Sequence, residues 1–184
     1  MRVISGEAKG FPLKVPRTTP TRPATDLVRG AIFSMLESMD LDWDRVLDLF
    51  SGSGAMGIEA LSRGAGHADF VEREPKACAI INENLEKTKL ASRGRVNCAT
   101  VSRALSFLDQ EYSIILIDPP YADTAIGDVI TRLAGSKLVG DDTVVVVTHS
   151  SHFALQPDYG ALGMIKERRH GDSVIAIYRK GGQA

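Results

Sequence analysis

Three glycines and a carboxylate stand at a spacing that suits nucleoside binding. Gly52, Gly54 and Gly57 match G-x-G-x-x-G, a pattern that lets a tight turn bring a ligand against the backbone at the start of a helix. Glu72 follows twenty residues after Gly52, where a carboxylate can accept hydrogen bonds from ribose hydroxyls. Together they favour a nucleoside cofactor over a purely structural turn.

Asp48 narrows the choice of cofactor, because it stands only four residues before Gly52. In dinucleotide-binding enzymes the N-terminus of the helix receives a pyrophosphate, which such a close carboxylate would repel. The same carboxylate suits the ammonium or sulfonium group of S-adenosylmethionine, which carries no phosphate. We therefore expect S-adenosylmethionine here, against the alternative that Asp48 only caps the loop.

A second reactive group is Asp118-Pro119-Pro120-Tyr121, which directly follows the apolar segment 113–117. Two successive prolines remove two N–H donors and fix the direction of the carbonyl groups. A carboxylate and a rigid carbonyl can accept both hydrogen bonds of an exocyclic amine, which frees its lone pair for attack on a sulfonium methyl group. A neighbouring aromatic ring can stack on an extruded base. The segment resembles motif IV of methyltransferases that act on amino nitrogen, and this resemblance implies methyl transfer to a base nitrogen through positioning and electrostatics.

The elements that must hold these groups alternate between strands and helices from residue 45 onward. We expect an α/β fold, with a doubly wound, Rossmann-like mixed sheet of seven strands whose C-terminal strand is antiparallel. Asp48 and Asp118 are then expected at the carboxyl edge of the sheet, where ligands bind. The expected strands are 45–50, 67–72, 95–100, 113–117, 143–148, 161–169 and 173–180, and the expected helices are 55–64, one opened by Pro75, 101–108 and 124–135.

The first forty residues have a different character. Four of the eight prolines lie within 5–24, which predicts an extended arm with a short hairpin rather than a core element. Thr25 is expected to cap a helix whose apolar face recurs at helical spacing as far as Met39. We divide the chain into a basic arm and helix, 1–40, and one globular unit, 41–184.

The charge is segregated although the net charge is only −1. Residues 1–30 carry +4 and residues 164–184 carry +3, so the part between them carries −8. The average argues against a polycationic nucleic-acid coat, whereas the family resemblance described below leads us to interpret the basic arm as a local RNA clamp. We interpret the basic C-terminal segment as an edge strand whose charged side chains are solvated.

Other features exclude several classes of protein. Only two cysteines, Cys78 and Cys98, are present, which excludes a disulfide framework and an all-cysteine metal site. His149 and His152 lack a third ligand at suitable spacing, so we expect no metal. No apolar run reaches the length of a membrane span, and the first residues lack the core of a signal peptide, which predicts a cytoplasmic location.

The order of these motifs resembles one known family. Residues 48–54 are similar to motif I of class I methyltransferases, and Ile117–Tyr121 resembles their motif IV for amino nitrogen. Together with RPATDLVRGAIFSML at 22–36, FVERE at 70–74 and HGDSVIAIYRK at 170–180, they resemble the bacterial 16S rRNA guanine-N2 methyltransferases, the small-subunit methyltransferase D family.

The resemblance implies transfer of a methyl group from S-adenosylmethionine to the exocyclic N2 of a guanine, guanine 966, in 16S rRNA of the assembling small subunit. S-adenosylhomocysteine is the product. We expect a monomer that binds no metal and does not associate with a membrane. Asp118, Pro119, Pro120 and Tyr121 would hold the guanine. Arg17, Arg22, Thr25 and Arg29 would contact RNA. Asp48, Phe50, Ser51, Gly52, Ser53, Gly54 and Glu72 would bind the cofactor, with Ser102 and the backbone near Ala104 against its adenine.

Three alternatives remain open. An N6-adenine DNA methyltransferase shares the Asp-Pro-Pro-Tyr motif, although 184 residues show no separate target-recognition domain. A nicotinamide oxidoreductase shares the glycine spacing, but Asp48 argues against it. An RNA-binding ribosome assembly factor with a silent transferase site would retain the motifs and give no methyl transfer.

Overall fold

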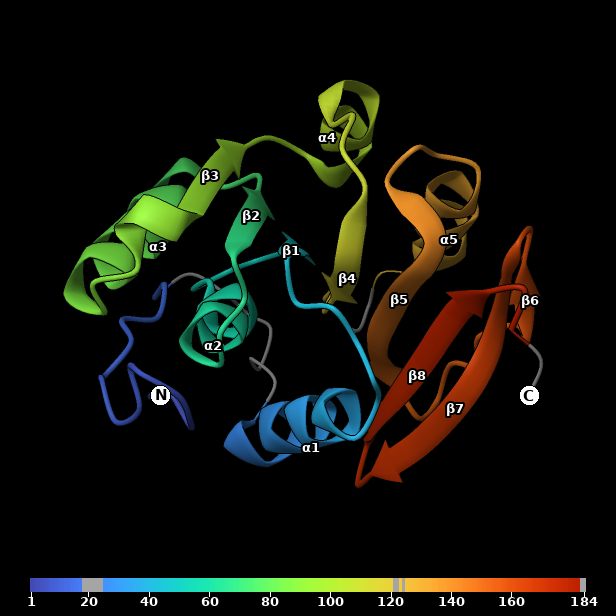
Figure 1. Ribbon diagram of the computed structural model, residues 1–184, viewed down its shortest axis with the longest axis horizontal. Helices are drawn as coiled ribbons and strands as arrows, with labels where there is room; N and C mark the ends of the chain where they lie inside the picture. The colour runs from blue at the N-terminus through green and yellow to red at the C-terminus, as the bar shows by residue number, and fades with distance from the viewer. Residues whose placement is uncertain (18–24, 121–122, 124, 183–184) are drawn as a thin grey trace.

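The computed structural model describes residues 1–17, 25–120, 123 and 125–182, which form an α/β protein around one mixed sheet (Figure 1). The strand order is β3-β2-β1-β4-β5-β8-β7-β6. The pairs from β3 to β5 are parallel, and those from β5 to β6 are antiparallel. This arrangement confirms the predicted doubly wound sheet with an antiparallel C-terminal strand.

The elements follow the predicted segments closely. The helices are α1 (Asp26–Glu37), α2 (Ala55–Ser62), α3 (Pro75–Lys87), α4 (Val101–Phe107) and α5 (Ile126–Ala134), with a short 3₁₀ turn at Ala91–Arg93. The strands are β1 (Arg45–Leu49), β2 (His67–Glu72), β3 (Gly94–Cys98), β4 (Tyr112–Ile117), β5 (Val139–Ser150), β6 (Asp158–Tyr159), β7 (Leu162–His170) and β8 (Ser173–Lys180).

The predicted number of strands is wrong by one within the described residues. The additional strand is β6, which pairs with β7 at the edge of the sheet. It has two residues, and so short a segment has no alternation that a sequence pattern can reveal.

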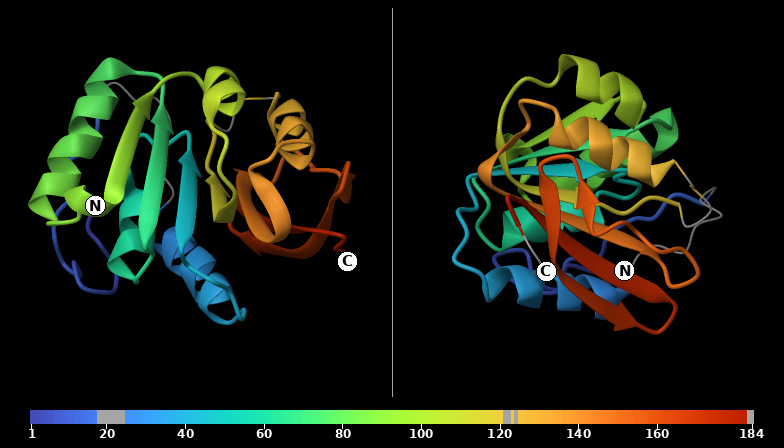
Figure 2. Two further views of the ribbon diagram at one scale, coloured as in Figure 1. Left: turned by 45° about the horizontal axis from the view of Figure 1, so that its top comes forward. Right: turned by 90° about the vertical axis from the view of Figure 1, so that its right-hand side faces the viewer.

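Helices lie on both faces of the sheet (Figure 2), and an apolar layer fills the space on each face. Alternate residues of β4 enter opposite layers, with Ile114 and Leu116 on the side of α1 to α3 and Ile115 and Ile117 on the side of α4 and α5. Burial on both faces explains the unbroken apolar runs of the central strands. None of the described helices is long and apolar enough to cross a membrane.

The N-terminal arm belongs to the core, contrary to the prediction. Val3, Ala8 and Leu13 are buried in the same apolar layer as α1 and α2. A bridge between Arg2 and Pro12 closes this segment into a short hairpin, as expected. These three apolar residues therefore bury the arm against the helices.

Candidate active site

The two reactive motifs meet at one edge of the sheet. Leu49 at the end of β1 stands beside Ile117 at the end of β4 in parallel register. Asp48 and Asp118 therefore lie close together, and their charges interact. The topology brings together residues that are seventy positions apart in the sequence.

Asp48 carries the most unusual electrostatics of the site. Its side chain is fully buried; Oδ2 accepts a hydrogen bond from the Gly57 N–H at 2.9 Å, and Oδ1 has no partner among the described residues. Burial raises the pKa of Asp48 to about 8, the Gly57 N–H opposes this, and the charges of Asp118 and Glu72 add to it. A cation beside Oδ1 would stabilise the carboxylate, so the position fits an ammonium or sulfonium group.

The turn after β1 is held in an uncommon backbone conformation. Phe50 has a φ of 60°, in the left-handed region that non-glycine residues rarely adopt. Ser51 fastens the turn, since its Oγ donates to the Asp48 carbonyl at 2.7 Å and accepts the Val71 N–H at 3.0 Å. Such strain is typical of ligand sites whose surroundings hold the backbone firmly.

Glycines shape this turn on both sides. A Cβ on Gly57 would lie 2.3 Å from the Phe70 ring, so only glycine lets α2 pack this closely on β2. A Cβ on Gly52 would meet nothing within 4 Å, which leaves room for a ligand against the backbone. Gly54 is the N-cap of α2. Ser53, between Gly52 and Gly54, is buried, and its carbonyl accepts a hydrogen bond from Asn84 at 2.9 Å.

Glu72 is held at the end of β2, next to the glycine turn. One carboxylate oxygen accepts the Gly52 N–H at 2.9 Å, and the other accepts the Glu74 N–H at 2.9 Å. Each oxygen retains a second lone pair. The carboxylate is thus fixed in orientation and can still accept from two ribose hydroxyls.

Asp118 has a partner that the sequence did not reveal. The hydroxyl of Thr148, a buried residue of β5, donates to Asp118 Oδ1. Pro119 is buried and Pro120 half-buried, while Tyr121 lies outside the described residues. The signal that could have found Thr148 is its place at the end of the neighbouring strand, beside the carboxyl end of β4.

The predicted adenine contact involves residues that are engaged elsewhere. The hydroxyl of Ser102 accepts a hydrogen bond from Arg132 of α5 at 2.7 Å, and its carbonyl accepts a second at 3.0 Å. Ala104 is buried in the layer below α4 and α5. Their contact with the cofactor stays a prediction.

Arg29 corrects the predicted RNA-binding set. Its side chain is 1% exposed, bonded to Asp26 at 3.0 Å and to the Arg2 carbonyl, and its Nε lies 3.9 Å from a carboxylate oxygen of Glu59. A guanidinium enclosed by these groups presents no charge to RNA, so it cannot belong to the RNA-binding surface.

The other three members of that set lie in different situations. Arg17 is exposed, and Arg22 lies outside the described residues. Thr25 caps α1 as predicted, its hydroxyl accepting the Val28 N–H at 3.3 Å.

Glu59 of α2 is a structural residue that sequence reasoning missed. It is fully buried, and its two carboxylate oxygens accept the backbone N–H groups of Ile4 and Ser5 at 2.8 and 2.9 Å. It also pairs with Arg63 at 2.9 Å and lies beside Arg29. The arm, α1 and α2 are therefore joined at one buried carboxylate.

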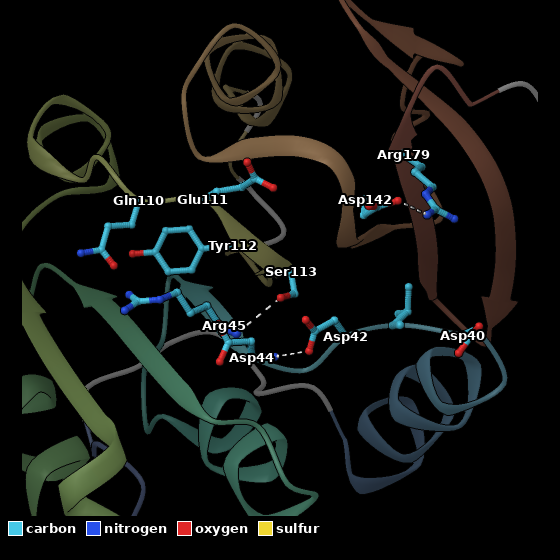
Figure 3. Close-up of a pocket in the computed structure, with 11 residues that line it drawn as sticks. Asp40, Asp42, Asp44, Arg45, Gln110, Glu111, Tyr112, Ser113, Asp142 and Arg179 are labelled. Atoms are coloured by element: carbon cyan, nitrogen blue, oxygen red, sulfur yellow. Dashed lines mark hydrogen bonds and ion pairs between the residues drawn. The ribbon is translucent and has the colours of Figure 1, made fainter.

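A separate cavity of about 580 Å³ opens at the opposite edge of the sheet (Figure 3). Its lining includes Arg45 and Tyr112, the first residues of β1 and β4, together with Asp42 and Glu111. The predicted site residues stand at the other ends of these strands, so this cavity does not belong to the candidate active site.

Comparisons with known proteins identify the relatives of this chain. The family model described as conserved hypothetical protein 95 matches residues 1–179. A Bacillus subtilis (strain 168) protein named "Putative rRNA methyltransferase YlbH" is 37% identical over 99% of this chain and 100% of its own. "Ribosomal RNA small subunit methyltransferase D" of Escherichia coli (strain K12) is 30% identical over 100% of this chain and 91% of its own.

A solved structure shows that the likeness extends to the fold. It is titled "Putative methyltransferase yhhF from Escherichia coli", has a TM-score of 0.84 and 28% identity, and covers 100% of this chain and 99% of its own. The predicted class I methyltransferase fold is thereby confirmed. With the buried carboxylate beside its glycine turn and the Asp-Pro-Pro segment at the same edge, the chain belongs to the conserved hypothetical protein 95 family, the small-subunit methyltransferase D family that its motifs predicted.

Proposed function

We propose that this protein transfers a methyl group from S-adenosylmethionine to the exocyclic N2 of a guanine in small-subunit rRNA, by the family resemblance guanine 966 of 16S rRNA. One observation carries the proposal: a buried, unpartnered carboxylate oxygen of Asp48 lies at the same sheet edge as Asp118. The first supplies a place for a cation, and the second supplies an acceptor for an amine. The names of the full-length relatives support rRNA as the substrate.

The residues present fit the cofactor. Asp48 would face its charged end, Glu72 its ribose hydroxyls, and the open side of Gly52 leaves space for it to approach the turn. When bound, S-adenosylmethionine supplies an electrophilic methyl group on a sulfonium. The protein contributes binding and orientation at that edge of the sheet.

Asp118 and the Asp-Pro-Pro backbone act on the nucleophile. The lone pair of an exocyclic amine is delocalised into the ring, which makes the amine a poor nucleophile. By accepting its N–H bonds, the Asp118 carboxylate and a carbonyl fixed by Pro119 and Pro120 favour a pyramidal nitrogen. The two acceptors would thereby orient the nitrogen lone pair toward the methyl group that bound S-adenosylmethionine would supply. Duplex RNA hides base edges, so the target guanine lies in a loop or single strand.

Binding and transfer are tested together. Calorimetry should show binding of S-adenosylmethionine, and radioactive methyl groups should enter small-subunit particles from a strain that lacks the protein. DNA and mature ribosomes serve as competing substrates, and Asp118→Ala as the inactive control. Methylation of DNA alone would point to the N6-adenine alternative, and RNA binding without methyl transfer to any of these substrates would point to a silent assembly factor.

A further inference from the structure

The β7–β8 hairpin carries two groups of cations with different surroundings. Arg179 and Lys180 of β8 pair with Asp142 at 3.0 Å and Asp141 at 2.9 Å. By contrast Lys166, Arg168 and Arg169 of β7 are exposed and form no ion pair within the described parts of the chain. The positive charge of the hairpin is therefore neutralised at one end and available at the other.

The end of the hairpin that carries the unpaired cations lies at the carboxyl ends of the parallel strands, where the candidate active site is. Thr148, which donates to Asp118, stands opposite Ile175 of β8, and Ile175 stands opposite Arg168 of β7. Asp118 and Arg168 are therefore three strand spacings apart, which is about 14 Å at roughly 4.8 Å per spacing. An arginine side chain at this position lies within the span of two or three nucleotides of the base held at Asp118.

Two of the three cations share a face with α1 and the N-terminal arm. Arg168 and Lys166 pair with Ile175 and Ile177, both of which belong to the apolar layer of α1. Because directly opposed residues of an antiparallel pair point to the same face, their side chains emerge on that side. Figures 1 and 2 show α1 beside this hairpin.

The acidic residue within the segment points away from that face. Glu167 pairs with Ala176, whose side chain lies in the opposite layer, and its carboxylate is 3.9 Å from His149. Arg169 shares this second face, and its Nε donates to the Gly171 carbonyl at 2.8 Å, which steadies the guanidinium at the turn. Its terminal N–H groups remain available to a phosphate.

We propose that Lys166, Arg168 and Arg169 bind the phosphate backbone of the substrate RNA next to the target base. The catalytic edge itself is acidic, through Asp48, Asp118 and Glu72, so a polyanion needs cations close by to approach it. Contacts to phosphate fix the position and register of the nucleic acid without reading its sequence. This inference rests on the proposed function, because it takes RNA as the substrate.

The test compares two variants of the same hairpin. Lys166→Ala/Arg168→Ala/Arg169→Ala removes the uncompensated cations, and Arg179→Ala/Lys180→Ala removes the neutralised ones. Binding to a 16S rRNA transcript and to small-subunit particles from a strain lacking the protein is measured between 50 and 200 mM salt. The triple variant should bind at least tenfold more weakly at 50 mM salt, and the slope of log K against log salt should fall by about 2 to 3. The double variant should retain most of the affinity, and both should keep full affinity for S-adenosylmethionine.

Wild-type affinity and slope in a correctly folded triple variant would overturn the inference while leaving the proposed function intact, provided the wild-type protein methylates rRNA. Failure of the wild-type protein to methylate or bind rRNA would overturn the proposed function itself. Weakened binding to particles with unchanged binding to the bare transcript would assign the surface to a ribosomal protein and contradict the RNA contact. If the triple variant melts early, Arg168→Ala alone should lower the slope by about 1, and an unchanged slope would again overturn the inference.

Discussion

At the scale of single residues, the site gathers negative charge where burial makes charge unfavourable. Asp48 is fully buried, and Asp118 and Glu72 lie close enough to raise its pKa further. This arrangement does not help the isolated chain to fold. It is expected where a carboxylate awaits a cationic ligand, and strongly shifted groups of this kind cluster at functional sites.

Asp48→Asn should remove a pH-dependent loss of folding stability and, at the same time, weaken the binding of S-adenosylmethionine. Below about pH 3.8 Asp48 is neutral in both the folded and the unfolded state. As the pH rises to about 8, the unfolded chain loses this proton while the folded one keeps it, so the wild-type protein loses stability through this group, by up to about 1.4 kcal/mol per pH unit. The neutral asparagine lacks this loss. Urea unfolding should show the variant gaining relative stability from pH 5 to 8, while calorimetry shows at least tenfold weaker binding of S-adenosylmethionine.

A parallel pH dependence in the two proteins would contradict the assigned burial of Asp48. Wild-type affinity for S-adenosylmethionine in the variant would show that the unpartnered oxygen does not face the cofactor. Asp109→Asn, the same type of change at an exposed residue outside the predicted site, is a suitable control.

Thr148→Val should slow methyl transfer, because it removes the donor that orients Asp118. Valine keeps the shape of threonine, and a hydrogen bond to a charged group contributes about 1.5–3 kcal/mol, so kcat should fall about 10- to 100-fold. KM for S-adenosylmethionine should stay constant. Thr148→Ser, which keeps the hydroxyl, should recover most of the rate; equal activity of the valine and serine variants would exclude a positioning role.

At the scale of elements, one buried ion pair joins three segments. Glu59 of α2 accepts backbone N–H groups from the arm and lies beside Arg29 of α1. These contacts hold the arm against the helix that begins at the glycine turn. The basic motif at 22–36 thus contributes to the structure of the site through Arg29, in addition to any contact that its exposed residues make.

Arg29→Ala should destabilise the fold by about 1–3 kcal/mol, because it removes the hydrogen bonds to Asp26 and the Arg2 carbonyl, while Glu59 keeps its pair with Arg63. Urea unfolding measures the loss. Arg17→Ala, an exposed residue of the same arm, should change stability by less than about 0.5 kcal/mol. Comparable stability of the two variants would show that the Arg29 pair carries little of the fold.

The pattern of apolar residues predicts the central elements well, since continuous runs such as 113–117 indicate strands that are buried on both faces. Local pattern cannot show which charge becomes buried. Arg29 is a charged residue near a helix start, and its enclosure involves Glu59, thirty positions later. Thr148 is likewise a polar residue directly after the apolar run of β5, and only the register of β5 against β4 places it at Asp118.

At the scale of the whole molecule, the segregated charge has a spatial meaning. The acidic edge formed by Asp48, Asp118 and Glu72 suits a cationic cofactor, and the uncompensated cations of β7 lie at the same edge. A substrate that is both a polyanion and a carrier of an amine matches this arrangement. This agrees with the proposed methylation of one guanine in small-subunit rRNA.

Mass mapping of rRNA tests that claim most directly. Small-subunit rRNA is digested from a strain that lacks the protein, from the same strain carrying the wild-type gene, and from one carrying Asp118→Ala. We expect N2-methylguanine at one position only with the wild-type gene, and an unmodified guanine at that position in the other two. Identical methylation in all three strains would contradict the account.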